Sequence, residues 1–430
     1  MMLAFGRALA ADVPPKAAAR RVVVTGIGMV NPLGNDAETA WRNILDGRSA
    51  IGPITRFDAA GLPVSLAAEV NGFDAGTRIP RRLVVKSDRF AHYAIAASGE
   101  ALTDSGIDLA AENPFRIGIS FGNNSGGWDI CERGFDEYYL QGPQLVNPWQ
   151  ATAWFPTAPQ GFVSIRFGLR GFSKSFACDR ASGGCALFFG VRCIQWGRAD
   201  VVLAGGTEAP ITRFVIAALA STGEISTLAD PGSAFCPFAE GRSGLVLGEG
   251  SAVLVLEEFG RARHRGAQIY GEILAVEQRT GRACRPDALT AAVTAALGRA
   301  AVRPSELDVV FAEGCGTPDG DMVEAAALVR ALGGGRYCAP VTAPKSAFGH
   351  LYGASLPSDL ACALLAGRDT VVPGTAGTQR ADASLPLDVV TSPRARPVRT
   401  ALVVSRAREG SAVALVTRCG AVEDERCCLS

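Results

Sequence analysis

The feature that most constrains the fold is an alternation of short apolar runs with segments of helical periodicity, which occurs twice along the chain. Apolar runs of this length are typical of buried strands. In the first half they read RRVVVTGIG, RIGISFG, ADVVLAGG and GSAVLVLEE. Helical spacing separates them, as in DAETAWRNILDG, where Asp36 is a candidate N-cap and Gly47 a candidate stop.

The scheme restarts after about residue 262. Strands are predicted for GAQIYGEILAVEQR, LDVVFAEG, TALVVSRAR and AVALVTR, and helices for DALTAAVTAALGRAAV and DMVEAAALVRALGG. Two successive α/β halves, with sheets covered on both faces, predict an α/β/α/β/α five-layer arrangement. We place the halves at residues 20–261 and 262–418, between flexible tails at 1–19 and 419–430.

One segment departs from this regular pattern. Residues 122–167 form a long aromatic insertion that holds three of the five tryptophans, Trp128, Trp149 and Trp154. We expect an irregular loop, and a loop of this length and aromatic content usually lines a site or meets a partner.

The composition excludes several classes of function. Lys+Arg and Asp+Glu both number 42, so no net charge attracts nucleic acid or an anionic membrane. No apolar run approaches the ~20 residues that span a bilayer. The twelve cysteines show neither CxxC pairs nor zinc spacing, and TGIGMVNPLG lacks the third glycine of a dinucleotide loop. We therefore expect a cytoplasmic protein with free thiols, no metal and no cofactor.

Several motifs, in order along residues 20–418, resemble the β-ketoacyl synthases of the thiolase superfamily. They are VVVTGIGMVNPLGND, ADVVLAGGTEAPI, CPFAEGRSGLVLGEGSAVLVLEE, VFAEGCGTPDGD and APKSAFGHLYG. The resemblance implies a thiolase fold with two pseudo-repeated halves. It also implies a family chemistry in which a cysteine at a helix N-terminus accepts an acyl chain from a carrier protein, with two histidines assisting.

The stretch FACDRASGGCAL covers the nucleophile position of that family. Counting back from CIQWGRADVVLAGG and forward from LRGFSKS both place Arg180 there. Cys178 lies two residues early, at the end of the preceding strand, and Cys185 lies in the following helix. The resemblance therefore implies a degenerate nucleophile site, although a catalytic Cys178 stays open as an alternative.

Of the two histidine positions of the family, one carries a histidine in this sequence and the other does not. The first histidine of the family corresponds to Glu313 in Phe311–Cys315, whereas His350, after Lys345, matches the second. The other two histidines, His92 and His264, lie in helical or charged contexts typical of solvated or packed side chains.

We predict that Arg180 and Glu313 form an ion pair, shared with Asp179, because a lone buried guanidinium costs several kcal/mol. The alternative is that Arg180 points to solvent.

Three features resemble one subfamily, the chain length factors or ketosynthase β subunits of type II polyketide synthases. They are the acid in VFAEG, the wording PVTAPKS, and the segment QGPQLVNPWQATAWFPTAPQGFVSIRFGLRG. The sequence departs from that subfamily at two positions, because Arg180 stands where glutamine is usual and His350 is retained. It also differs from active synthases, whose glycine- and phenylalanine-rich loop is replaced here by Ala407–Gly410.

The subfamily resemblance implies a non-catalytic subunit that pairs with a homologous catalytic ketosynthase. It would shape the tunnel for a growing polyketide or polyene chain on an acyl carrier protein, without nucleic-acid or membrane partners. The alternative is a condensing or decarboxylating enzyme in its own right that uses Cys178 and/or His350.

The resemblance also implies two contact regions. The dimer would form through the strand before the nucleophile position, which comprises Phe172, Ser173, Lys174, Ser175, Phe176 and Ala177. The tunnel would be plugged by Trp128, Cys131 and Phe135, which are spaced i, i+3 and i+7 on one helical face. The same spacing is also typical of a stripe packed in a core.

Overall fold

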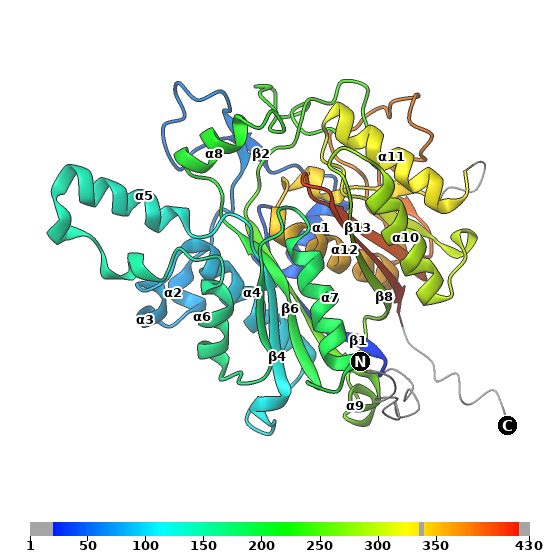
Figure 1. Cartoon of the computed structure of the whole chain (residues 1–430), viewed down its shortest axis with the longest axis horizontal. Helices are drawn as coiled ribbons and strands as arrows, with labels where there is room; N and C mark the ends of the chain where they lie inside the picture. The colour runs from blue at the N-terminus through cyan, green and yellow to red at the C-terminus, as the bar shows by residue number, and fades with distance from the viewer. Residues whose placement is uncertain (1–19, 335–338, 421–430) are drawn as a thin grey trace, which may run out of the picture.

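A computed structural model describes residues 20–334 and 339–420. The predicted tail at 1–19 and all but the first two residues of the tail at 419–430 lie outside the described residues. The described chain is built on one ten-stranded sheet with the order β10-β9-β13-β14-β8-β1-β7-β6-β4-β5 (Figure 1).

The first half of the sheet comes from the first half of the chain. Its strands are β1 (Val22–Val30), β4 (Ile117–Gly122), β5 (Ser173–Phe176), β6 (Val201–Glu208) and β7 (Gly250–Glu258). Their order is β1-β7-β6-β4-β5, with β7 antiparallel to both neighbours and β4 parallel to β6 and β5. The apolar runs identified in the sequence form these strands, and β1, β4, β6 and β7 are almost wholly buried.

The second half of the sheet repeats this topology. Its strands are β8 (Gly271–Thr280), β9 (Val309–Phe311), β10 (Val341–Thr342), β13 (Thr400–Arg406) and β14 (Ser411–Cys419). They follow the order β8-β14-β13-β9-β10 with the same relative directions. The two halves meet edge to edge where Val23 pairs with Glu272 and Val24 with Gly271.

Helices occupy equivalent places in the two halves. In the first half, α4 (Arg89–Ser105), α6 (Ala158–Phe167) and α7 (Ser182–Gln195) follow β1, β4 and β5. In the second half, α10 (Asp287–Ala300), α11 (Pro318–Leu332) and α12 (Ser355–Asp369) follow β8, β9 and β10. Helices α7 and α12 pack on each other and on strands of both halves, whereas α4 and α10 cover the outer faces. This gives the predicted five layers.

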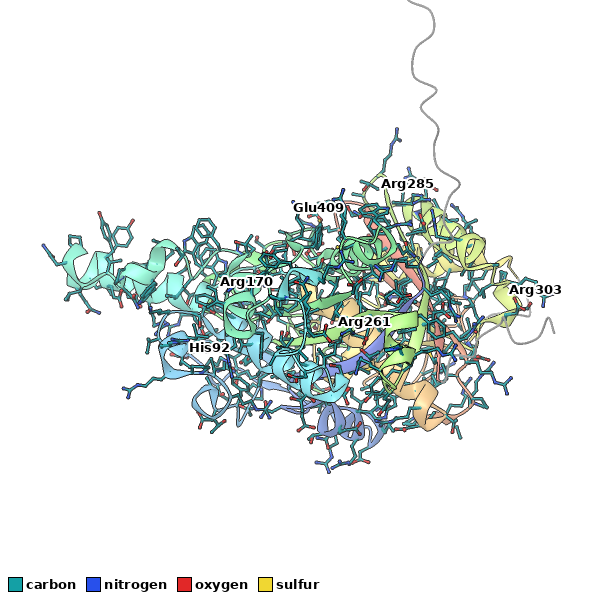
Figure 2. All side chains as sticks on the ribbon, turned by 90° about the horizontal axis from the view of Figure 1, so that it is seen from below. His92, Arg170, Arg261, Arg285, Arg303 and Glu409 are labelled. Atoms are coloured by element: carbon teal, nitrogen blue, oxygen red, sulfur yellow. The ribbon has the colours of Figure 1, made fainter. Side chains whose placement is uncertain are left out.

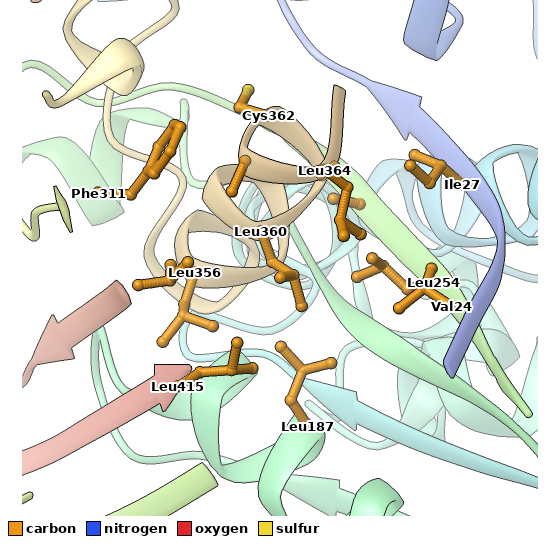
Figure 3. Close-up of a cluster of buried hydrophobic side chains, with 14 of the residues drawn as sticks. Val24, Ile27, Leu187, Leu254, Phe311, Leu356, Leu360, Cys362, Leu364 and Leu415 are labelled. Atoms are coloured by element: carbon orange, nitrogen blue, oxygen red, sulfur yellow. The ribbon is translucent and has the colours of Figure 1, made fainter. Parts of the chain in front are cut away.

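The central layer holds the largest apolar core. Leu356, Leu360 and Leu364 of α12 face Leu187 of α7 and strand residues of both halves, among them Leu254 of β7 (Figure 3). Separate clusters lie under α4 and under α10 with α11. The core thus fixes the N-termini of α7 and α12, which lie next to the predicted nucleophile and histidine positions.

The remaining short elements close the ends of the layers. They are α1 (Ala37–Leu45), α2 (Ala75–Arg78), α3 (Arg81–Val84), α8 (Arg213–Ala220), α9 (Phe259–His264), β2 (Ile51–Pro53), β3 (Leu66–Ala68), β11 (Val371–Val372) and β12 (Arg394–Ala395). At α1 the predicted cap is confirmed, since the Asp36 carboxylate accepts from the Thr39 backbone N–H at 2.8 Å. Gly47, the predicted stop, has a φ of 68°.

At residues 122–167 the prediction of an irregular loop is wrong, whereas the helical spacing of Trp128, Cys131 and Phe135 agrees with the structure. The segment contains α5 (Trp128–Asp136), a π-helical turn (Glu137–Gln141), short 3-10 turns and α6. Helix α5 projects from the body of the molecule (Figure 1). The exposed Phe135 lies in α5, and the exposed Leu140 lies in the π-helical turn that follows it.

Among residues 20–334 and 339–420, no helix has the length and apolarity needed to cross a membrane. Within the same residues, no group of three or more His, Cys, Asp and Glu side chains is arranged to hold a metal ion.

Candidate functional site

The predicted nucleophile position is a tight elbow between β5 and α7. Asp179 adopts a left-handed backbone conformation with φ of 50°. The Ser182 hydroxyl accepts from the Cys178 N–H at 2.8 Å and donates to the Asp179 carbonyl at 2.6 Å. The Ser182 hydroxyl thus holds the turn, and Arg180 is the residue at its end.

Arg180 points inward and is 1% exposed, so the solvent-facing alternative is wrong. Its Nε lies 3.5 Å from Glu313 Oε1 and 3.7 Å from Asp179 Oδ2. The predicted ion pair, shared with Asp179, is confirmed. A third carboxylate, Glu224, lies 3.4 Å from Arg180 Nη2.

Glu224 was missed by the sequence analysis. It lies just after α8, 44 residues from Arg180 in the chain, and no motif links the two positions. Three carboxylates around one guanidinium compensate the cost of burying it, although Arg180 Nε and Nη1 make no hydrogen bond with ideal geometry.

Glu313 also contacts His350, the histidine that is retained. Glu313 Oε1 lies 2.8 Å from His350 Nε2, and both side chains are fully buried. The Tyr352 backbone N–H donates to His350 Nδ1 at 3.0 Å, so the imidazole proton lies on Nε2 and is donated to Glu313. Burial lowers the pKa of His350, which favours this neutral form.

A buried lysine supports the glutamate from behind. Lys345 Nζ donates to the carbonyls of Ala312 and Glu313 at 2.7 and 2.9 Å and pairs with Asp359 at 2.6 Å. Burial alone would raise the pKa of Glu313, but His350, Lys345 and Arg180 together hold it at about 2. Glu313 is therefore an anion whose charge is balanced by an ion pair with Arg180 and a hydrogen bond from His350.

The backbone of the Glu313 loop is held by a second acid. The carboxylate of Glu324 in α11 accepts from the N–H groups of Glu313 and Gly314 at 2.7 and 2.9 Å. Burial raises the pKa of Glu324 to about 7. The loop is thereby fixed with its glutamate facing the elbow.

A cavity of about 340 Å³ remains beside Arg180. Its lining includes Thr317 and Arg408, and the Arg408 backbone N–H donates to Asp179 Oδ2 at 2.8 Å. Arg285 and Glu409, which adjoin lining residues of this cavity, lie along the same edge of the molecule (Figure 2). Arg408 of the loop Ala407–Gly410 therefore contributes a charged side chain to the lining of the cavity.

The site as a whole is poorly suited to acyl transfer. The elbow presents a guanidinium in place of a thiol, and the Nε2 proton of His350 is donated to a carboxylate. His92 lies in α4, where its ring contacts the Val84 carbonyl, and His264 is exposed at the end of α9. Neither histidine can replace the one that Glu313 displaces.

The two cysteines of the elbow differ in their burial. Cys178 is half-buried in the loop after β5, and Cys185 is buried in the first turns of α7. Interaction with the Cys185 thiol lowers the pKa of Cys178 to about 7, although burial and Glu409 oppose this. Neither sulfur takes the nucleophile position at the elbow.

The three predicted tunnel residues share α5 but differ in exposure. Cys131 is buried and Trp128 is half-buried, whereas Phe135 is 49% exposed. The Trp128 ring stacks on Phe214 of α8, with centroids 4.5 Å apart and an interplanar angle of 15°. Phe214 was not singled out from the sequence because it lies in a separate helix.

The predicted dimer strand forms the end of the sheet. In the described part of the chain, β5 pairs with β4 alone, and Ser173 and Lys174 are exposed. Phe172 and Ala177 lie immediately outside the strand. The nearby insertion carries large exposed apolar side chains, namely Phe135, Tyr138, Tyr139, Leu140, Leu145, Trp154, Phe155 and Ile165.

Two family models match this chain. The beta-ketoacyl synthase N-terminal domain matches residues 19–262, and the C-terminal domain matches residues 270–379. The chain is 40% identical to a putative polyketide beta-ketoacyl synthase 2 of Streptomyces coelicolor, over 94% of this chain and 96% of the relative. It is 38% identical to the tetracenomycin polyketide synthase ketoacyl synthase beta subunit of Streptomyces glaucescens, over 92% and 98%.

Solved structures agree with the sequence relatives. The ishigamide ketosynthase/chain length factor superposes with a TM-score of 0.88 at 28% identity, covering 94% of this chain and all of the other. A type II polyketide synthase ketosynthase, solved with its acyl carrier protein and a bound hexaketide, gives 0.84 at 26% identity with the same coverage. The chain has the thiolase fold and belongs to the beta-ketoacyl synthase family, within which it groups with the ketosynthase beta subunits, or chain length factors, of type II polyketide synthases.

Proposed function

We propose that this chain is a non-catalytic chain length factor. It pairs with a homologous catalytic ketosynthase and shapes the tunnel that holds a growing polyketide or polyene chain carried by an acyl carrier protein. We infer that it acts in the cytoplasm, and that residues 20–261 and 262–418 are its two ketosynthase halves.

The ion pair of Arg180 and Glu313 carries this proposal. The guanidinium stands where a ketosynthase needs a thiolate, and the carboxylate stands where it needs a proton donor. Their atoms lie 3.5 Å apart in a fully buried setting. Because a thiolate and an oxyanion donor are both missing, the growing chain would be bound and extended by the partner's residues.

The free edge of β5 supports pairing with a homologous subunit. An exposed edge strand adds readily to a matching strand, and such addition about a twofold axis joins two sheets. Gln160 of α6 contacts both Ser173 and Ser175, so α6 and β5 present one surface. The exposed aromatic residues of the insertion, such as Trp154 and Phe155, extend that surface with the side chains enriched at interfaces.

Trp128, Cys131 and Phe135 are the proposed tunnel residues. Trp128 is anchored by its stack on Phe214, so it presents a fixed ring edge instead of a mobile side chain. Cys131 is buried, and Phe135 is left exposed for contact with the partner. A bulky ring at the first of these positions would limit how far the growing chain can extend.

Reconstitution tests the proposal. The chain would be expressed alone and together with a cysteine-bearing ketosynthase from the same biosynthetic system, and each sample would be given malonyl-loaded carrier protein. We expect no condensation from this chain alone and polyketide formation from the pair. Condensation or malonyl decarboxylation by the chain alone would instead support the alternative enzyme that uses Cys178 or His350.

A further inference from the structure

Arg406, at the end of β13, is a buried guanidinium that the proposed function does not use. It is 6% exposed, and its Nη2 donates to the Gly320 carbonyl at 3.0 Å. Among the residues that the structure describes, its Nε has no hydrogen-bond partner and no carboxylate forms an ion pair with it. Arg406 therefore carries a positive charge in the interior without a direct counter-charge, which is costly.

The buried acid Glu324 does not supply that counter-charge. Burial raises its pKa to about 7 although Arg406 lowers it, so the carboxyl group is only partly ionised at neutral pH. Its two oxygens accept from the backbone N–H groups of Glu313 and Gly314 at 2.7 and 2.9 Å. The guanidinium of Arg406 is thus left able to pair with an anion from solution.

Arg406 lines the cavity of about 340 Å³ beside Arg180. The charged residues of the lining are these two, the exposed Arg408, and the acids Glu224 and Asp319. Three guanidinium groups therefore face two carboxylates, one of which, Glu224, already pairs with Arg180. The surplus positive charge falls on Arg406 and Arg408.

The size and walls of the cavity suit a small oxyanion. Its volume of about 340 Å³ is close to the lower end of ligand pockets. The 15-residue helix α11 begins at the cavity, so the partial positive charge of its N-terminus adds to the guanidinium groups. Guanidinium groups bind carboxylates and phosphates through paired N–H donors. Arg408 is available for this because its pair with Glu409, at 3.8 Å between exposed side chains, is weak.

We propose that the cavity between α11 and the β13–β14 turn is a binding site for one small oxyanion, a phosphate or a carboxylate group, held by Arg406 and Arg408.

Inorganic phosphate is the first probe. Added to the full chain at pH 7, it should raise Tm saturably, with a half-effect on the order of 1 mM, whereas sodium chloride of equal ionic strength should not. Sodium acetate, added in the same way, separates a carboxylate site from a phosphate site, and a saturable rise with either anion supports the proposal. Equal shifts with phosphate, acetate and chloride, or no shift with any of them, would overturn it.

A substitution tests whether the response arises at Arg406. Arg406→Met keeps an unbranched side chain without the charge and should abolish the shift produced by phosphate. Arg330→Met is the matched control, because Arg330 is an exposed arginine in the last turn of α11 and its loss changes the net charge equally. This control should keep the full shift. A full shift in Arg406→Met would contradict the assigned site.

Arg408→Met covers the case in which Arg406→Met does not fold, because Arg408 is exposed. It should weaken phosphate binding about tenfold in isothermal titration calorimetry, through the loss of one charge-assisted contact. An affinity equal to that of the wild-type chain would overturn the proposal.

Discussion

The elbow around Arg180 and the insertion at residues 122–167 differ in the side chains that they bury and expose. The elbow buries charged groups, and the insertion exposes aromatic ones. At the site, charged groups lie in the core, and each is matched to an opposite charge, as in Arg180 with Glu313 and Lys345 with Asp359. On the insertion, aromatic side chains such as Tyr139 and Trp154 lie in solvent without a covering layer. The first region presents a guanidinium at the elbow, whereas the second has the composition of an interface. The contrast indicates that the chain acts through contacts with a partner.

The largest expected effect comes from breaking the buried pair. Glu313→Ala should lower the free energy of unfolding by about 3–5 kcal/mol, because it leaves a buried guanidinium with weaker compensation. Chemical denaturation of the chain would measure this. Glu224→Ala is the matched control, since Glu224 is 20% exposed, and should cost about 1 kcal/mol or less. Equal losses from both variants would contradict a special role for Glu313.

Substitutions in the insertion should weaken binding to the partner more than they lower the stability of the isolated chain. Replacing both Trp154 and Phe155 by alanine should weaken binding to the catalytic ketosynthase about 100-fold, as expected for aromatic interface residues. The same double variant should lower the unfolding free energy of the isolated chain by only about 1–2 kcal/mol, because Trp154 is 39% and Phe155 44% exposed and the two rings stack on each other. Titration calorimetry of the pair would measure the affinity.

Met322→Ala serves as a control for that experiment. Met322 is 52% exposed on α11, in the other half of the molecule. It should change neither affinity nor stability. An equal loss of affinity in this variant would mean that the insertion is not the contact surface.

Acid should affect the buried site more than the insertion. The pKa of Glu313 falls from its ordinary 4.5 to about 2, so its ionisation contributes about 3 kcal/mol of stability. This contribution is present above pH 4.5 and is lost as the pH falls towards 2. The stability gap between wild type and Glu313→Gln should therefore narrow in that range. Unfolding free energies measured from pH 6 to pH 3 would check it, and a gap that stays constant would contradict the assigned ionisation.

The smallest expected effect concerns the tunnel. Trp128→Ala removes a half-buried ring and its stack on Phe214, which should cost about 1–2 kcal/mol of stability. The reconstituted pair should then make longer products, measured by mass spectrometry. Phe115→Ala removes an exposed aromatic ring outside the insertion and should leave product length unchanged. Unchanged length with Trp128→Ala would argue against the plug.

Local pattern predicted most of the fold and the centre of the site. The strands and helices follow from apolar periodicity, and counting along gapless motifs placed Arg180, Glu313 and His350 together. The sequence did not reveal Glu224 or Phe214, because their contacts arise from the packing of α8 against distant segments. It also missed α6 and the short helical turns of the insertion, whereas the helical spacing of Trp128, Cys131 and Phe135 agrees with α5.

The edge-to-edge junction of the two halves was not predicted either. It rests on two residue pairs between β1 and β8, and such a short contact depends on where the two strands meet in space. No local sequence signal encodes that placement.

The central claim is that all condensation chemistry belongs to the partner. The most direct test is a heterodimer in which the nucleophilic cysteine of the catalytic ketosynthase is replaced by alanine while this chain stays unchanged. Product formation would be followed with malonyl-loaded carrier protein. We expect condensation to disappear although the pair still assembles. Residual condensation that Cys178→Ser then removes would contradict it.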